Sequence, residues 1–280
     1  MKIETISDHQ PVFTSSTVAT HMPFFDGSTL LFCQAGQPIE RELINQGSIH
    51  KNLLRNPVLA ERLKNLTRNQ KINYRAWKLA FCNWEDRAIH PITTGLPANG
   101  IECSPAFYRD GGQVHLSFIG GVPSDRGFTY SLYSSSGSDL EHLEPAKPIL
   151  RRTAFFGFIS LDHICWGLRN KLTLTEKASG KVFQLKTNFI RIFRVTFVAD
   201  NAGKLLITGS NDKHQYKTVL HDLETKNTSE VSAGGSVYKS SLNADCLVHA
   251  KQRKNGFEDR ELYHGSYTLT PTAIQIFNGD

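Results

Sequence analysis

Several polar residues stand just before apolar segments that each end in an aspartate turn, and these residues have the clearest capacity for chemistry. They are Glu102, the candidate catalytic residue, and the candidate ligand-binding residues His21, Arg152, Arg194, Tyr238 and Lys239. A carboxylate among cations and hydroxyl groups can bind a polar or anionic ligand, or exchange a proton with it. Cleavage of a glycosidic bond needs two carboxylates, one to protonate the leaving oxygen and one to attack or activate water. Because this set holds one carboxylate, it favours binding over hydrolysis.

The elements that must position these residues are five repeated hairpins. Each has a short apolar strand, a turn with aspartate and a second apolar strand; the segments are MPFFDGSTLLFCQAG, PAFYRDGGQVHLSFIGG, FFGFISLDHICWGLRN, RVTFVADNAGKLLITGS and YKSSLNADCLVHAK. The turn residues are Asp26, Asp110, Asp162, Asp200 and Asp245. Asp and Gly tolerate the positive φ of tight turns. Hairpins at such spacing are typical of propeller blades. The sequence therefore predicts an all-β fold, a five-bladed β-propeller that forms one domain over residues 1–280.

In a propeller, the first strand of each blade lies nearest the central axis. We expect these inner strands near residues 18–25, 102–108, 153–161, 191–199 and 236–244. The residues that begin them then meet in a central funnel, although they lie far apart in the sequence. A shift of register by one residue turns a strand side chain to the opposite face, so the pattern predicts positions along the strands better than orientations.

The gap between the first two turns is too long for one blade and predicts an insertion. The segment RAWKLAFCNWEDRAIHPI resembles the outer strands of a blade, which leaves residues 37–71 as an insertion in the first blade. Within it, Asn56 and Pro57 fit a helix start, and leucines recur at helical spacing. Its seven Lys or Arg and three Glu contribute 7 − 3 = +4 to the net charge. A partner protein could dock on residues 40–70 through this charge. A sixth blade at residues 72–95 is the alternative, but that segment holds one convincing strand pair.

A propeller must also protect the open edge of its last blade. The early segment QPVFTSST is suitably placed to form the outermost strand beside the C-terminal TAIQIF. We therefore expect the two ends of the chain to pair and close the ring.

Three of these segments resemble a known family. The stretch IECSPAFYRDGGQVHLSF is similar to the Glu-Cys-Pro and Glu-Gly-Pro segments of the furanosidase-type glycoside hydrolases, the invertase, levansucrase and arabinanase group. HMPFFDGSTLLFCQAG resembles the first hairpin of that group, and SSSGSDLEHLEP resembles its blade-ending loop, with Leu143 in place of a tryptophan. The resemblance implies a five-bladed propeller with an acidic trio: a base or nucleophile in the first blade, an Asp that stabilises the transition state, and a Glu acid.

Residue by residue, the resemblance carries over only in part. Glu102 matches the acid motif, although it falls in the second hairpin and the family's glutamate usually sits in the third. His21 or Met22 stands where an aspartate should precede Pro23. The sequence therefore favours recognition of a carbohydrate, or of a related polar or anionic ligand, in the central funnel, with hydrolase activity lost or altered. The alternatives are a propeller that docks a partner protein through the basic insertion, and an active glycoside hydrolase that uses Glu102.

Composition limits the remaining classes. The chain has 280 residues, of which 39% are hydrophobic, a formal net charge of +6 and five scattered cysteines without CxxC spacing. These values fit a globular chain and predict neither a disulfide framework nor a zinc site. No segment resembles a secretory signal or a membrane span, so we expect a cytoplasmic protein. The positive charge points to anionic ligands, with nucleic acid a less favoured partner. No cofactor or metal is expected.

Overall fold

The computed structural model describes residues 2–13, 20–38, 75–124, 127–151, 156–168, 170–211, 216–231, 238–243, 246–252 and 260–270. All regular structure in these ranges is β-strand. The strands are β1 (Lys2–Pro11), β2 (Thr20–Phe25), β3 (Thr29–Pro38), β4 (Arg75–Asn83), β5 (His90–Pro91), β6 (Ile101–Asp110), β7 (Gln113–Ser124), β8 (Gly127–Gly137), β9 (Lys147–Arg151), β10 (Gly157–Ile159), β11 (His163–Leu168), β12 (Lys171–Glu176), β13 (Val182–Lys186), β14 (Arg191–Val198), β15 (Asn201–Ser210), β16 (Tyr216–Asp222), β17 (Thr228–Val231), β18 (Tyr238–Asn243), β19 (Cys246–Gln252) and β20 (Arg260–Thr270). The same ranges contain no helix with the length and apolar character needed to cross a membrane.

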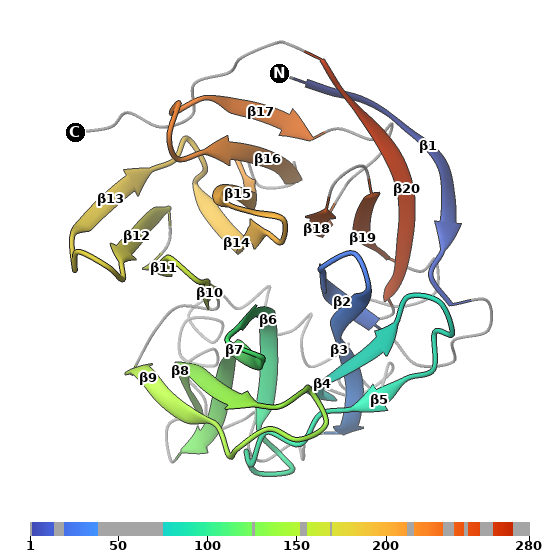
Figure 1. Cartoon of the computed structure of the whole chain (residues 1–280), viewed down its shortest axis with the longest axis vertical. Helices are drawn as coiled ribbons and strands as arrows, with labels where there is room; N and C mark the ends of the chain where they lie inside the picture. Colours follow the sequence, from blue (N-terminus) through green and yellow to red (C-terminus); the bar gives the residue numbers. More distant parts are fainter. Residues whose placement is uncertain are drawn as a thin grey trace, which may run out of the picture.

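The strands form four sheets arranged around a central axis, as in a β-propeller (Figure 1). Three sheets have four strands each, in the orders β2-β3-β4-β5, β6-β7-β8-β9 and β10-β11-β12-β13. The fourth has eight strands in the order β14-β15-β16-β17-β1-β20-β19-β18. The all-β propeller arrangement predicted from the hairpins is therefore confirmed for the described residues.

Strand β1 joins the two halves of the eight-stranded sheet. It pairs antiparallel with β20, for example Ile6 with Tyr267, and it pairs parallel with β17 through Ile3 and Val231. An early strand thus lies beside a late one, as ring closure requires. The observed pairing joins residues 2–11 to residues 260–270, whereas the sequence predicts pairing of 10–17 with 272–277. Residues 14–17 and 272–277 lie outside the described residues.

Strands are found at each of the five predicted inner positions, namely β2, β6, β10, β14 and β18. Four of them, β2, β6, β10 and β14, lead to turns whose residues line one cavity, so they run in the same direction along the axis. We call the end where these inner strands begin the strand-start end, and the end where their turns lie the turn end. Positive φ at Gly27, Gly111 and Gly112 fits the tight turns expected after β2 and β6. The third inner strand, β10, has three residues and ends at Ile159, before the Asp162 turn.

The insertion predicted at residues 37–71 needs one correction. Gln37 and Pro38 belong to β3, which continues until Pro38 pairs with Arg75 of β4. The rest of the segment, with its predicted helix, lies outside the described residues. The outer strands predicted from Arg75 onward are confirmed, since β4 and β5 complete the sheet of β2 and β3.

The main core lies where the sheets face one another near the axis. Alternate residues of β7, Val114, Leu116 and Phe118, are buried, as strand periodicity requires. Closer to the axis, the ring of Phe24 lies 5.3 Å from that of Phe107 and 5.0 Å from that of Phe197. Phe158 lies 5.3 Å from Phe197. These four rings come from four inner strands, so aromatic packing fills the middle of the propeller.

Candidate functional site

Glu102 lies at the strand-start end of β6, where the sequence predicts it, and its carboxylate is fully engaged by the protein. The side chain is 2% exposed. It accepts hydrogen bonds from the Nζ of Lys78 at 3.2 Å, the backbone amide of Leu79 at 3.0 Å and the hydroxyl of Thr94 at 2.7 Å. The three donors satisfy this buried carboxylate with partners from the protein itself. Glu102 thus links β6 to β4 of the neighbouring sheet.

Arg194 of β14 is also buried, at 1% exposure. Its Nη2 donates to the backbone oxygen of Pro105 at 3.4 Å. Burial lowers the pKa of the Arg194 guanidinium to about 10, an effect opposed by the nearby thiols of Cys33 and Cys103. The guanidinium stays protonated at neutral pH and lies between β14 and β6 near the axis.

The other predicted ligand-binding residues are placed only in part. His21 belongs to β2, and Tyr238 and Lys239 belong to β18, so their backbones lie on inner strands. Their side chains, and the whole of Arg152, lie outside the described part of the chain. A role for these four residues in binding stays a prediction.

Met22 is one of the two residues, with His21, that stand where the family resemblance leads us to expect an aspartate before Pro23. Its side chain is 6% exposed and belongs to the main hydrophobic core. Five residues of the strand-start end, Glu102, Arg194, Met22, Thr20 and Ser104, are buried, whereas Arg191 at the start of β14 is exposed. None of these five lines either of the two cavities described below.

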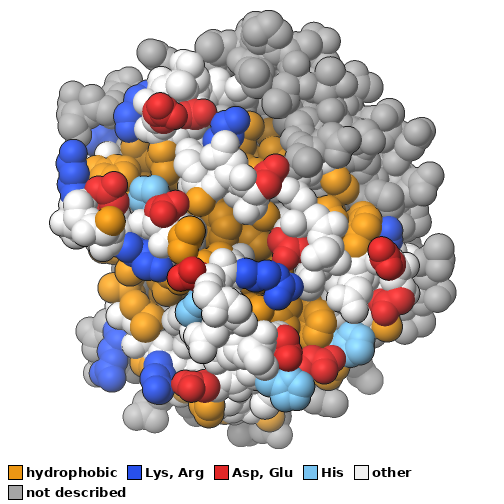
Figure 2. Space-filling view, in the orientation of Figure 1, with side chains coloured by type: hydrophobic (Ala, Val, Ile, Leu, Met, Phe, Trp, Pro, Cys, Tyr) orange, Lys and Arg blue, Asp and Glu red, His pale blue; other side chains and the backbone are white. Residues whose placement is uncertain are grey.

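Two cavities lie at the turn end. A cavity of about 410 Å³, which we call the axial pocket, lies where four inner hairpins end; its lining residues are Asp26, Phe107, Tyr108, Arg109, Leu161, Phe197, Ala199, Asp200 and Ala202. Its floor is apolar and aromatic; of its charged residues, Asp26 and Asp200 lie in turns and Arg109 lies near the end of β6. Figure 2 shows the matching surface pattern, with hydrophobic side chains gathered at the centre of one face and charged side chains around them.

The charged residues of the axial pocket are held by defined contacts. Oδ1 of Asp26 accepts hydrogen bonds from the backbone amides of Ser28 at 3.0 Å and Thr29 at 2.7 Å, which fixes the turn. Its other oxygen, Oδ2, lies 3.6 Å from Nε of Arg109. Tyr108 stacks on His115, with ring centroids 4.8 Å apart, and its hydroxyl accepts a hydrogen bond from Nζ of Lys177 at 3.0 Å.

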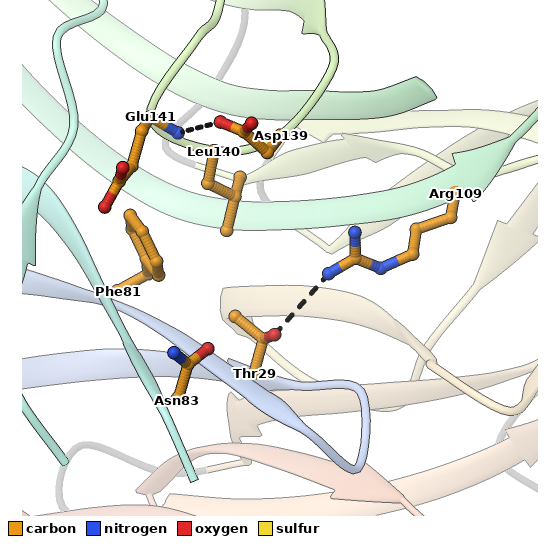
Figure 3. A pocket seen from close by; sticks show the side chains of 7 residues that line it. All are labelled: Thr29, Phe81, Asn83, Arg109, Asp139, Leu140 and Glu141. Carbon is orange, nitrogen blue, oxygen red and sulfur yellow. Dashed lines mark hydrogen bonds between the residues drawn. The ribbon is translucent and has the colours of Figure 1, made fainter. Parts of the chain in front are cut away.

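A second cavity of about 250 Å³, the cleft pocket, adjoins the first. It is lined by Thr29, Phe81, Asn83, Arg109, Asp139, Leu140 and Glu141 (Figure 3). Asp139 accepts hydrogen bonds from Nδ1 of His142 at 2.8 Å and from the backbone amide of His142, also at 2.8 Å. These bonds hold the pKa of the Asp139 carboxyl at about 2. Glu141 lies 3.1 Å from Nδ1 of His90.

Sequence reasoning identified Asp26 and Asp200 only as turn-forming residues and missed both pockets. The informative pattern was present, because charged residues recur at the end of several inner strands, and such positions share one face of a propeller. Among the described residues, no group of three or more His, Cys, Asp or Glu side chains is arranged to hold a metal ion.

Comparison with known proteins gives a clear result for the fold. No family model and no curated sequence matches the chain. Among solved structures, a GH43_1 enzyme from Xanthomonas citri complexed with xylotriose superposes with a TM-score of 0.54 at 10% identity, over 97% of this chain and 94% of that one.

Two further structures are similar over most of their length. The β-xylosidase/α-arabinofuranosidase CoXyl43 from a compost metagenome has a TM-score of 0.52 at 11% identity and covers 97% of this chain and 98% of its own. The arabinanase Arb43A from Bacillus subtilis has a TM-score of 0.51 at 12% identity and covers 90% and 95%. The chain therefore has the propeller fold found in these glycoside hydrolases.

Proposed function

We propose that this protein recognises a carbohydrate without hydrolysing it, and that the axial pocket at the turn end holds the sugar. The observation that carries the proposal is the lining of this pocket. Tyr108 supplies a partly exposed aromatic side chain, in contact with His115 and Lys177, above the buried ring of Phe107. Asp26, Arg109 and Asp200 supply acceptors and donors at the edge of the pocket. Sugars present apolar ring faces and hydroxyl groups that both donate and accept hydrogen bonds, so an aromatic surface beside carboxylate and guanidinium groups fits them. Two of the enzymes that share the fold are complexed with xylotriose.

The proposal includes five blades. The eight-stranded sheet divides into β14–β17 and the set β18-β19-β20-β1, and a single parallel pair joins the two halves. Each half has four strands in the antiparallel order of the other sheets. Counting each half as a blade agrees with the five aspartate turns and with the family resemblance.

Loss of hydrolysis is supported by the state of the two residues that match the family's catalytic positions. Glu102 is buried and accepts three hydrogen bonds from the protein, which leaves its carboxylate little capacity to protonate a leaving oxygen. Met22 cannot act as a base or nucleophile. A glycosidase mechanism needs a pair of carboxylates around one bond.

The test combines binding with catalysis. The purified protein is applied to an array of immobilised glycans and is assayed for release of sugars from xylan and arabinan oligosaccharides. We expect saturable binding that weakens at least tenfold in Asp200→Asn and Tyr108→Leu, no change in the exposed control Lys181→Ala, and no hydrolysis. Absence of binding to every glycan would overturn the proposal. If the wild-type protein hydrolyses a glycan and Glu102→Gln does not, the protein is an active hydrolase that uses Glu102, and the proposal is wrong.

A further inference from the structure

The two pockets share one wall, which is the side chain of Arg109. This residue lies near the end of β6, and Figure 3 shows its guanidinium reaching toward Thr29, across the cleft pocket from the loop of Asp139 to Glu141. Nη2 donates to Oγ1 of Thr29 at 3.5 Å, and Nε lies 3.6 Å from Oδ2 of Asp26. The side chain is still 52% exposed. The guanidinium is therefore held at the boundary between the pockets with donors available to a ligand on either side.

The cleft pocket repeats the chemistry of the axial pocket on a smaller scale. Phe81 and Leu140 are buried and form its apolar surface, while Asn83 is exposed and offers both an amide donor and a carbonyl acceptor. Its volume of about 250 Å³ is below the roughly 300–1,000 Å³ usual for small-molecule sites, whereas the axial pocket falls within that range. The cleft pocket is thus better suited to one end of a longer ligand than to a ligand of its own.

The charged side chains that line the two pockets favour a neutral ligand over an acidic one. The linings of the two pockets contain four carboxylates, from Asp26, Asp139, Glu141 and Asp200, and one cation, Arg109. Asp26 lies beside Arg109, Asp139 beside His142 and Glu141 beside His90. An acidic ligand would meet four negative groups here, in spite of the net charge of +6 of the whole chain. A neutral ligand with many hydroxyl groups avoids this repulsion and can use the same side chains as hydrogen-bond donors and acceptors.

From these observations we infer that the axial and cleft pockets are adjacent subsites for one chain of neutral sugars, with Arg109 between them as a shared donor. The inference rests on the proposed function and specifies its ligand as a neutral oligosaccharide of at least two units. The site is separate from the position of the acid motif. Glu102 and Arg109 stand near opposite ends of the same strand, on the order of 20 Å apart at about 3.3 Å per residue.

The experiment compares chain lengths and charges by isothermal titration calorimetry. The probes are xylose, xylobiose, xylotriose, arabinotriose and trigalacturonic acid. We expect the wild-type protein to bind at least one neutral trisaccharide ten or more times more tightly than a monosaccharide, and to bind trigalacturonic acid more weakly than either neutral trisaccharide.

Variants separate the two subsites. Asn83→Ala, in the cleft pocket, should weaken trisaccharide binding several-fold and leave monosaccharide binding unchanged. Arg109→Ala should weaken both, and Arg109→Lys should restore only part of the loss, because lysine keeps the charge without the forked donors. Lys181→Ala is the control, and circular dichroism verifies that each variant is folded.

The outcomes distinguish this inference from the proposed function. Three results would overturn the two-subsite inference while carbohydrate recognition stands. The first is equal affinity for mono- and trisaccharides, and the second is an unaltered affinity of Asn83→Ala for trisaccharides. The third is a preference for the acidic trisaccharide. If neither neutral trisaccharide binds but other glycans are retained on the array, the inference is again wrong. If no glycan binds at all, the proposed function falls with it.

Discussion

The backbone amide of Ser104 donates a hydrogen bond to the sulfur of Met22, over 3.1 Å, and so joins the first two inner strands near the axis. Both residues have positive φ, 54° for Met22 and 51° for Ser104, a conformation that residues other than glycine seldom adopt. Each lies where the pairing of its strand with the next is irregular. The bulges therefore accompany a contact between the apolar thioether of Met22 and the neighbouring strand β6.

This contact predicts a specific cost for a conservative change. Met22→Leu keeps the apolar volume but removes the sulfur acceptor, which leaves the buried amide of Ser104 without it. We expect the free energy of unfolding to fall by about 1–2 kcal/mol. Leu31→Met, the reverse exchange in the same core, should cost less. Chemical denaturation measures both, and a Met22→Leu variant as stable as Leu31→Met would show that the sulfur contact contributes nothing.

A second prediction concerns the clamp around Glu102. Glu102→Gln keeps the shape of the side chain, but it removes the charge beside Lys78 and turns an amide NH₂ toward groups that are themselves donors. The free energy of unfolding should fall by roughly 1–3 kcal/mol. Thermal and urea unfolding provide the measurement. Glu144→Gln is the matched control, because Glu144 is exposed, and it should change stability by less than about 0.5 kcal/mol. Equal stability of the two variants would contradict a structural role for Glu102.

The pH dependence of stability should include a contribution from His221. This side chain is buried, and its Nδ1 lies 2.9 Å from Oγ1 of Thr228. Burial, assisted by Lys226 and opposed by Asp222, lowers the pKa of His221 from 6.5 to about 4. The unfolded chain then takes up a proton at higher pH than the folded one. The stabilisation is complete above pH 6.5 and is lost as the pH falls toward 4, by an amount on the order of 2–3 kcal/mol.

Unfolding curves between pH 4 and 8 test this assignment. His221→Gln should lose less stability between pH 6.5 and 4 than the wild-type protein does. Lys181→Ala, a change at an exposed position that does not titrate in this interval, should follow the wild-type curve. Parallel curves for wild type and His221→Gln would refute it.

Thiol reactivity offers a prediction about the interior. Cys33, Cys82, Cys103 and Cys165 are buried, whereas Cys246 is partly exposed. Burial raises the pKa of Cys82 to about 12 and raises that of Cys165 further, so neither forms the reactive thiolate at neutral pH. In the folded protein a thiol reagent should modify one cysteine rapidly, and Cys246→Ser should abolish that phase. Rapid reaction of two or more thiols would show that the interior is more open than described.

The sequence was most informative about the hairpins and least informative about the site. Asp26-Gly27 and Asp110-Gly111 fix tight turns through local chemistry, so the strands before them could be located from the chain alone. Glu102 was correctly placed at the start of an inner strand. Its burial could not be predicted, because Lys78 and Thr94 reach it from another sheet and from a loop whose path depends on tertiary packing. The cavities at the turn end were missed for a similar reason. Their existence depends on how Phe107 and Phe197 pack across the axis, and no local pattern records this.

The position of β1 has a consequence for how the protein folds. Ile6 pairs with Tyr267, and Ile3 pairs with Val231, so one strand from the start of the chain fills the gap between two strands from its end. Contacts between such distant residues carry the largest loop-closure entropy and form slowly. During synthesis β1 has no partner until β17 has left the ribosome, and its longer antiparallel pairing waits for β20, so strand edges remain open in the meantime. Until that last pairing, the chain is an open arc with free strand edges, the state in which it is most exposed to aggregation and to exchange of strands between copies.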